Sequence, residues 1–229
     1  MSLDITKTDS KLGEEIHYYL EEKSVETPMQ ESALLKPITD FERNKIQNNF
    51  KDILITLGLD LTDDSLAQTP SRMGKMFLNE LFWGLDYHNF PKCTTVENKM
   101  GYDEMVIERN IKVNSVCEHH LVTIYGNGAN IAYIPDKKVL GLSKLNRIVE
   151  YFCRRPQIQE RLTEQIFYAL EYILGTSNIA IVIEAEHFCV KSRGVEDVNS
   201  DTVTSKLGGL FKKESALRAE FMGLIKSTT

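Results

Sequence analysis

The spacing of apolar residues predicts helices in the N-terminal part of the chain. Apolar residues recur every three or four positions over 11–23 and over 41–57, which is the period of amphipathic helices. Thr69 precedes Pro70, so we expect a third helix with Thr69 as its N-cap, ending near Gly84. This part of the chain is therefore predicted to be mostly helical.

The middle of the chain changes to an extended pattern. Residues 105–113 and 121–134 are rich in Val, Ile, Tyr and Thr, which predicts two strands. Gly126 and Gly128 interrupt the second strand and predict a turn or bulge there. A later β-branched run over 178–190 predicts a central strand of the same sheet.

Three more helices complete the predicted α+β fold. Ser143 is expected to cap a helix that runs through Phe152, and Pro156 to open another that ends at Gly175. A closing helix is predicted over 217–225. Helices, then strands, a helix pair and a last long strand indicate helices packed over a single sheet.

Composition limits the compartment and the partners. The chain has 229 residues, a net charge of −6 and 42% hydrophobic residues, which exclude a disordered chain and a global nucleic-acid-binding surface. Apolar runs fall short of the roughly 20 residues that span a bilayer, and the N-terminus lacks the apolar core of a secretory signal. We therefore expect a cytoplasmic protein with neither nucleic acid nor membrane as a partner, whose four cysteines are thiols or metal ligands.

The first candidate site combines cysteine and histidine. Cys117 and His120 are three residues apart in a predicted connection between strands, so a thiolate and an imidazole can reach one ion. Cys189 is the best further ligand, and alternation along its strand places it on the same face as His187. Two cysteines, one histidine and an open position are typical of catalytic zinc. A disulfide between the two cysteines, or a buried packing thiol at Cys189, is the alternative.

Basic residues at a predicted helix start indicate an anion site. Lys144 and Arg147 lie on one face of the turn that follows Ser143, where free N–H groups attract anions. The alternative is a solvated basic face. Four more cations could contribute to a phosphate pocket: Lys191, Arg193, Arg72 and Lys75.

The helix expected after Pro156 carries a carboxylate in its first turn. Glu160 could favour the positive end of the helix dipole, as acidic residues at this position commonly do. Alternatively, its two oxygens could accept two adjacent N–H donors from a guanine edge. The composition of the chain leaves both roles open.

Five motifs resemble those of the GTP cyclohydrolase I family in order and spacing. The resemblance covers nearly the whole chain and is weakest before about Ser24. The motifs are CEHH at 117–120, GLSK at 141–144, RPQIQER at 155–161, HFCVKSRG at 187–194 and LGGLF at 207–211. Five motifs in register are far more specific than any one of them.

The resemblance implies a zinc-dependent hydrolase that opens the imidazole ring of GTP. The family converts GTP and water into 7,8-dihydroneopterin triphosphate and formate, which commits GTP to folate or other pterin synthesis. By motif match, zinc would bind Cys117, His120 and Cys189. His187 would be the general acid toward the purine imidazole, and His119 would assist ring opening and the ribose rearrangement.

The same motif match implies contacts to each part of GTP. Glu160, with Gln159 beside it, would anchor guanine, and Ser143 would contact the ribose. Five cations would bind the triphosphate: Lys144, Arg147, Arg193, Arg72 and Lys75.

The implied architecture is the tunnelling fold, a four-stranded antiparallel sheet with helices on one face. We expect a helical N-terminal region over 1–95 and the catalytic domain over 96–229. Subunits of the family close into pentamers, and two pentamers stack into a homodecamer with active sites between subunits. The sheet edges would then pair with neighbours instead of aggregating.

Two other functions compete with this one. Another tunnelling-fold enzyme, acting on pterins or deazapurines, would carry different metal or nucleophile motifs, so CEHH together with HFC argues against it. A non-catalytic, zinc-stabilised oligomeric binding protein would need the metal ligands but neither His119 nor His187. Release of formate from GTP separates the three.

Overall fold

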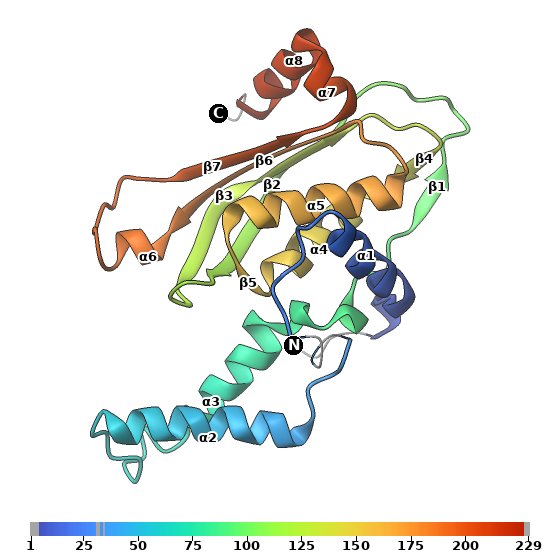
Figure 1. Cartoon of the computed structure of the whole chain (residues 1–229). Coiled ribbons are helices and arrows are strands. Elements are labelled where there is room, and N and C mark those ends of the chain that lie inside the picture. Colours follow the sequence, from blue (N-terminus) through green and yellow to red (C-terminus); the bar gives the residue numbers. More distant parts are fainter. Residues whose placement is uncertain (1–4, 31–32, 34, 227–229) are drawn as a thin grey trace.

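One large sheet forms the centre of the computed structural model, which describes residues 5–30, 33 and 35–226 (Figure 1). The strand order is β5-β2-β3-β6-β7; the four longer strands pair in antiparallel fashion and short β5 joins β2 in parallel. The predicted antiparallel sheet is thus confirmed, with β5 as an addition. The strands are β2 (Val106–Cys117), β3 (Thr123–Tyr133), β5 (Pro156–Gln157), β6 (Ile179–His187) and β7 (Thr202–Leu207).

Helices precede, interrupt and follow this sheet, and β1 (Thr95–Glu97) pairs with β4 (Lys138–Leu140) beside it. No helix in the described part of the chain is long and apolar enough to cross a membrane. The α-helices are α1 (Ser10–Glu22), α2 (Asp40–Thr56), α3 (Thr69–Met76), α4 (Leu142–Cys153), α5 (Gln159–Leu174), α6 (Phe188–Lys191), α7 (Gly209–Lys213) and α8 (Ser215–Lys226). Shorter turns are η1 (Ile5–Lys7), the π-helical η3 (Phe77–Leu81), η4 (Trp83–Leu85) and η5 (Tyr87–Asn89).

Helices α4 and α5 cover one face of the sheet and build the main core there (Figure 1). Ile131 and Ile181 are cross-strand partners on that face and are fully buried. Their neighbours Ala132 and Ala180 point to the other face, where they pack with side chains of α7 and α8 such as Phe211. The alternation of side chains along each strand thus serves two apolar layers.

A bulge in β3 lies where the two glycines predicted one. The β3–β6 register shifts between Tyr125 and Gly128, and Gly128 has a φ of +141°, which L side chains rarely adopt. A Cβ at Gly126 would lie 2.3 Å from the carbonyl oxygen of Glu184. Both glycines therefore let β3 bend while it stays paired.

The N-terminal arm is tied to α4 and α5 through a buried polar network. Ile16 and Leu20 of α1 belong to the main core. Arg155, fully buried, forms an ion pair with Glu26 at 3.3 Å and donates hydrogen bonds to Thr27 and Gly84. This network anchors the segment before α2 to the chain that leads into β5.

Helix α2 packs Phe50 against Phe77 but leaves several of its other apolar side chains exposed. None of the residues of α2, all of which are described, is buried, and Phe41 is 75% exposed. With α3 it forms a separate layer away from the sheet (Figure 1). The helix itself was predicted correctly, and a capping box on Thr39 and Glu42 starts it.

Three predicted helix starts and two strand ends are wrong. The first predicted strand continues to Cys117 instead of ending at 113, so Cys117 lies in β2 and not in a connection between strands. The N-cap of α3 is Gln68 instead of Thr69, because a hydrogen-bonded turn leads straight into the helix. The N-cap of α4 is Gly141, since the chain turns directly after β4 and places Ser143 inside the first turn. Pro156 belongs to β5 and pairs with Val116 of β2, so α5 begins only at Gln159.

The other wrong strand end also concerns a site residue. β6 ends at His187, and Cys189 lies in the helical turn α6, which follows at once. Strand alternation therefore does not relate His187 to Cys189. The turn nevertheless keeps the two residues together.

Candidate functional site

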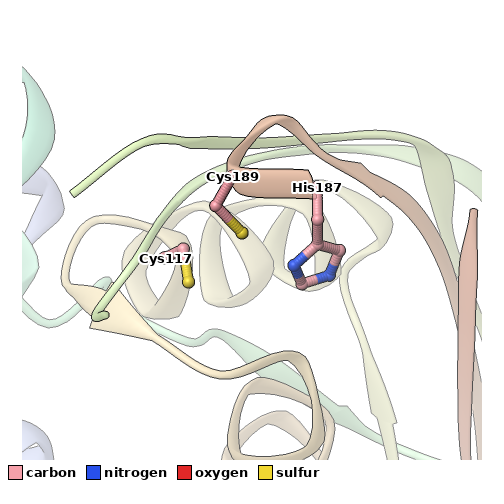
Figure 2. A group of neighbouring side chains, drawn as sticks. All are labelled: Cys117, His187 and Cys189. Carbon is pink, nitrogen blue, oxygen red and sulfur yellow. The ribbon is translucent and has the colours of Figure 1, made fainter. Parts of the chain in front are cut away.

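Two cysteines and a histidine converge at one end of the sheet (Figure 2). Cys117 is the last residue of β2, His187 is the last residue of β6, and Cys189 follows in α6. Both strands flank β3, so their ends lie beside each other. One ligand atom from each residue lies within 4.8 Å of the other two.

The cluster has the chemistry of a metal site. Both cysteines are free thiols, Cys117 is 3% exposed and Cys189 is half-buried. Burial and the neighbouring Cys117 raise the pKa of the Cys189 thiol, because two thiolates repel each other without a cation between them. Thiolate and imidazole are the ligands that zinc prefers, and two ligands on a tetrahedral zinc lie about 3.5–3.8 Å apart. Small side-chain movements therefore suffice to bind a metal.

The two histidines of CEHH lie next to the cluster. His119 Nδ1 is 3.6 Å from the sulfur of Cys117. His120 is outside the group of three that the described residues form, and its Nε2 accepts a hydrogen bond from Arg193 at 3.2 Å. This bond brings Arg193, which was expected to bind the triphosphate, to the CEHH turn.

An ion pair fastens the CEHH turn to α5. Arg161 donates two hydrogen bonds to the Glu118 carboxylate, at 2.7 and 3.1 Å. The bond from Arg161 lowers the pKa of Glu118. The Glu118 backbone N–H also donates to the carbonyl of Gln157 at 2.9 Å, so β5 and α5 both hold the turn. Arg161 is the last residue of the RPQIQER motif, but the sequence predicted no role for it.

The first turn of α5 faces His187. Gln159 Oε1 is 2.8 Å from His187 Nε2, and Gln159 is only 1% exposed. Burial lowers the pKa of His187, while the negative charge of nearby Glu160 opposes the shift. Glu160 is exposed, so its carboxylate is available to a ligand.

The α4 cations lie at the other end of the molecule from the cluster. Asn146, between Lys144 and Arg147, donates to Glu108 near the start of β2 at 3.2 Å. Cys117 lies nine positions after Glu108 along β2, which is up to about 30 Å at roughly 3.3 Å per residue. One subunit therefore does not bring Lys144, Arg147 or the adjacent Ser143 to its own metal cluster.

Arg72 and Lys75 are also outside this cluster. Both are exposed on α3, which lies in the layer away from the sheet (Figure 1). The remaining cysteines, Cys93 and Cys153, are packing thiols, and burial raises the pKa of each to about 12. One chain thus unites Cys117, Cys189, His119, His120, His187, Gln159, Glu160 and Arg193.

Fold and site define a class of protein: an α+β domain with a thiol–imidazole metal-type cluster at one end of its sheet. The family model described as GTP cyclohydrolase I matches residues 46–226. The chain is 56% identical over 207 residues to GTP cyclohydrolase 1 of Aeromonas salmonicida, covering 90% of this chain and 93% of that protein. The chain belongs to the GTP cyclohydrolase I family.

Two further relatives carry the same name. GTP cyclohydrolase 1 of Tolumonas auensis is 54% identical over 203 residues, covering 89% of this chain and 92% of the relative. GTP cyclohydrolase 1 of Shewanella oneidensis is 51% identical over 213 residues, covering 93% of this chain and 97% of the relative. The similarity therefore extends well beyond the site motifs.

Proposed function

We propose that the chain catalyses the GTP cyclohydrolase I reaction, a hydrolysis of C–N bonds in the imidazole ring of GTP. GTP and water give 7,8-dihydroneopterin triphosphate and formate, the first step of folate synthesis. The observation that carries the proposal is the convergence of two thiols and an imidazole in a member of this family. Buried Cys117 and half-buried Cys189 beside exposed Glu160 and Arg193 suit a site that admits a nucleotide.

Zinc is the metal we assign to the cluster. Cys117, His120 and Cys189 would hold it, which leaves a fourth position open as in other catalytic zinc sites. Its support is the pair of cysteine sulfurs, which lie within 4.8 Å of each other and of a His187 ring nitrogen, because thiolate and imidazole are ligands that zinc prefers. When bound, zinc acts as a Lewis acid and makes water a nucleophile near neutral pH.

The third protein ligand is a choice between two histidines. His187 lies with the thiols in the described cluster, whereas His120 is bonded to Arg193. We assign the ligand role to His120 on the match to the CEHH motif; its Nε2 accepts a hydrogen bond from Arg193 and so carries the lone pair that a metal ligand needs. His187, already engaged by Gln159, is left to transfer protons.

Side chains of this chain bind and orient the purine. Glu160 accepts the two adjacent N–H groups on the guanine edge, which fixes the imidazole ring near the cluster. In its protonated form, His187 donates a proton to that ring as water adds at C8 and becomes neutral, and His119 assists ring opening and the later ribose rearrangement. A histidine titrates in the pH range that such transfers need.

Neighbouring subunits complete the site in this proposal. Ser143 would contact the ribose, while Lys144, Arg147, Arg72 and Lys75 join Arg193 at the triphosphate. Since Ser143, Lys144 and Arg147 of one chain lie far from its own cluster, we assign them to the cluster of another subunit. A homodecamer of two stacked pentamers is the assembly we propose.

The division of the chain follows from these roles. We assign residues 96–229, which carry the cluster and the sheet, to the catalytic domain, and residues 1–95 to a helical region. A cytoplasmic location remains a prediction from the sequence.

The test is product analysis with the zinc-loaded oligomer. We expect equal amounts of formate and of a pterin that fluoresces after oxidation. Cys189→Ser is the matched control, because it changes one sulfur to oxygen and should abolish both products. Absence of formate from zinc-loaded wild type would contradict the proposal, and the non-catalytic binding protein would then be favoured.

A further inference from the structure

Gln159 occupies a buried position between α5 and the last two strands. Its side-chain nitrogen donates to the carbonyl oxygens of Ile183 at 3.1 Å and Thr202 at 2.9 Å, and lies 3.2 Å from Thr204 Oγ1. Its side-chain oxygen lies 2.8 Å from His187 Nε2. Every polar atom of this amide therefore has a partner within the chain.

These partners fix which way the amide faces. Backbone carbonyls only accept hydrogen bonds, so the NH₂ group must face Ile183 and Thr202. The carbonyl oxygen of the amide must then face His187, and it too can only accept. Consequently, His187 Nε2 carries the hydrogen of this bond.

The hydrogen on Nε2 defines the other nitrogen of the ring. In neutral imidazole, one nitrogen donates and the other carries a lone pair, so Nδ1 is the nitrogen with the lone pair. Figure 2 shows one ring nitrogen of His187 on the side of the two sulfurs, and Gln159 engages the other. Nδ1 is thus the atom that faces the reaction site.

Two threonines support the Gln159 position from behind. Thr163 Oγ1 donates to the backbone carbonyl of Gln159 at 2.9 Å, and it lies 2.7 Å from Thr204 Oγ1. Thr163 belongs to α5 and Thr204 to β7. The orientation of the His187 ring is therefore set by three elements: α5, β6 and β7.

We propose that Gln159 is a positioning residue for His187, which fixes the ring and its Nε2–H form so that Nδ1 alone exchanges protons with the substrate. This differs from the guanine contact that the resemblance implied for Gln159. The inference rests on the proposed function only for the identity of the substrate. The burial of Gln159 and its saturated amide support it, because a guanine contact would require breaking bonds to backbone carbonyls.

A pair of adjacent residues provides the kinetic test. We expect Gln159→Met, which matches the side chain in length, to lower kcat about 10- to 100-fold with KM for GTP nearly unchanged. Glu160→Gln is the matched control and should mainly raise KM, since it loses the anionic acceptor for guanine. A rise in KM for Gln159→Met as large as that for Glu160→Gln, without loss of kcat, would overturn the proposal.

A second measurement needs no turnover. In metal-free full-length protein, Gln159→Met should bind GTP as tightly as wild type, while Glu160→Gln should bind it more weakly. Nitrogen-15 NMR of histidine-labelled protein, with His187→Ala for assignment, should show hydrogen on Nε2 in wild type and a mixture of both neutral forms in Gln159→Met.

These outcomes separate the two proposals. Wild type without formate release but with His187 in the Nε2–H form would contradict the proposed function and uphold the positioning role. Nδ1–H in wild type would overturn the positioning role whatever the activity. Thr204→Val leaves the His187 bond in place and serves as the test if Gln159→Met fails to fold. Its kcat should fall less than tenfold, with the Nε2–H form of His187 retained. Loss of the Nε2–H form together with an unchanged kcat would overturn the proposal.

Discussion

His17 shows how single buried groups hold the N-terminal arm in place. Its side chain is 1% exposed, and Nδ1 lies 2.9 Å from the Glu26 carboxylate. The bond to Glu26 raises the pKa of His17, although burial opposes the shift. Burial by itself would raise the pKa of Glu26, but His17, Arg155, Tyr87 and the Thr27 backbone outweigh burial and lower it. Below the raised pKa of His17, the charged pair is therefore the stable form in the folded protein.

A pH-dependent loss of stability follows from the raised pKa of His17. Its contribution is complete below the unfolded pKa near 6.5 and is lost as pH rises through the folded pKa. We expect His17→Gln to cost about 1.5–3 kcal/mol at pH 6 and less at pH 9, where a neutral hydrogen bond is lost. Denaturant unfolding at fixed protein concentration measures this difference. Tyr18→Phe, on the exposed side of α1, should parallel wild type at both pH values, and an equal cost of His17→Gln at both would contradict the account.

Metal content distinguishes the roles of the cluster residues. Cys189→Ser should lose zinc and turnover while the oligomer persists, because an alcohol is a poor zinc ligand. His120→Ala should also lose zinc, whereas His187→Ala should keep about one zinc per subunit and lose ring opening. Metal analysis of the purified variants checks this. If His120→Ala kept zinc and His187→Ala lost it, His187 would be the zinc ligand and our assignment of His120 would be wrong.

At the scale of elements, the CEHH turn depends on the start of α5. The turn follows β2 directly, and Arg161 and Gln157 hold it from the opposite side. A metal site needs such support because ligands must be oriented before the ion binds. The Glu118–Arg161 pair thus couples the position of α5 to the geometry of the cluster.

Removal of this ion pair should weaken metal binding. We expect Arg161→Met to reduce zinc affinity about 10- to 100-fold, measured by chelator competition. Lys206→Met is the control. It also breaks an ion pair to α5, the 2.7 Å pair between Lys206 and Glu164, but this pair joins α5 to β7 instead of to the CEHH turn. Equal zinc affinity in Arg161→Met and Lys206→Met would show that the pair does not orient the turn.

Element types followed from the sequence, and local boundaries did not. Apolar periodicity predicted α1, α2 and the long strands, and Gly175, with a φ of +69°, ends α5 as expected. Pro156 was misjudged because its pairing with Val116 depends on a strand forty residues earlier in the chain. The CEHH and HFC motifs indicated the metal cluster, but the His187–Gln159 bond joins two motifs whose relative placement only the fold decides.

At the scale of the whole molecule, the separation of cations and cluster is the main argument for the proposed assembly. Lys144 and Arg147 follow β4, whereas Cys117 lies at the far end of β2. Among the described strands, β7 lies at the edge of the sheet, where another subunit could pair with it. An oligomer in which each site takes the cluster from one subunit and cations from another explains both features.

Mixed oligomers test this sharing. Cys189→Ser and Lys144→Met should each be inactive as pure oligomers. When equal amounts are unfolded and reassembled together, about one quarter of the sites should receive an intact cluster from one subunit and an intact lysine from another. Formate release near a quarter of the wild-type rate is the expected result. Persistent inactivity of the mixture, with its assembly verified by mass, would place both residues in the site of a single chain.

The fate of one carbon atom tests the central claim most directly. Zinc-loaded protein is incubated with GTP that carries carbon-13 at C8, and the products are followed by NMR. Ring opening with loss of C8 predicts one labelled formate for each unlabelled dihydroneopterin triphosphate. Label that remains in a purine nucleotide, or phosphate release without labelled formate, would contradict the account.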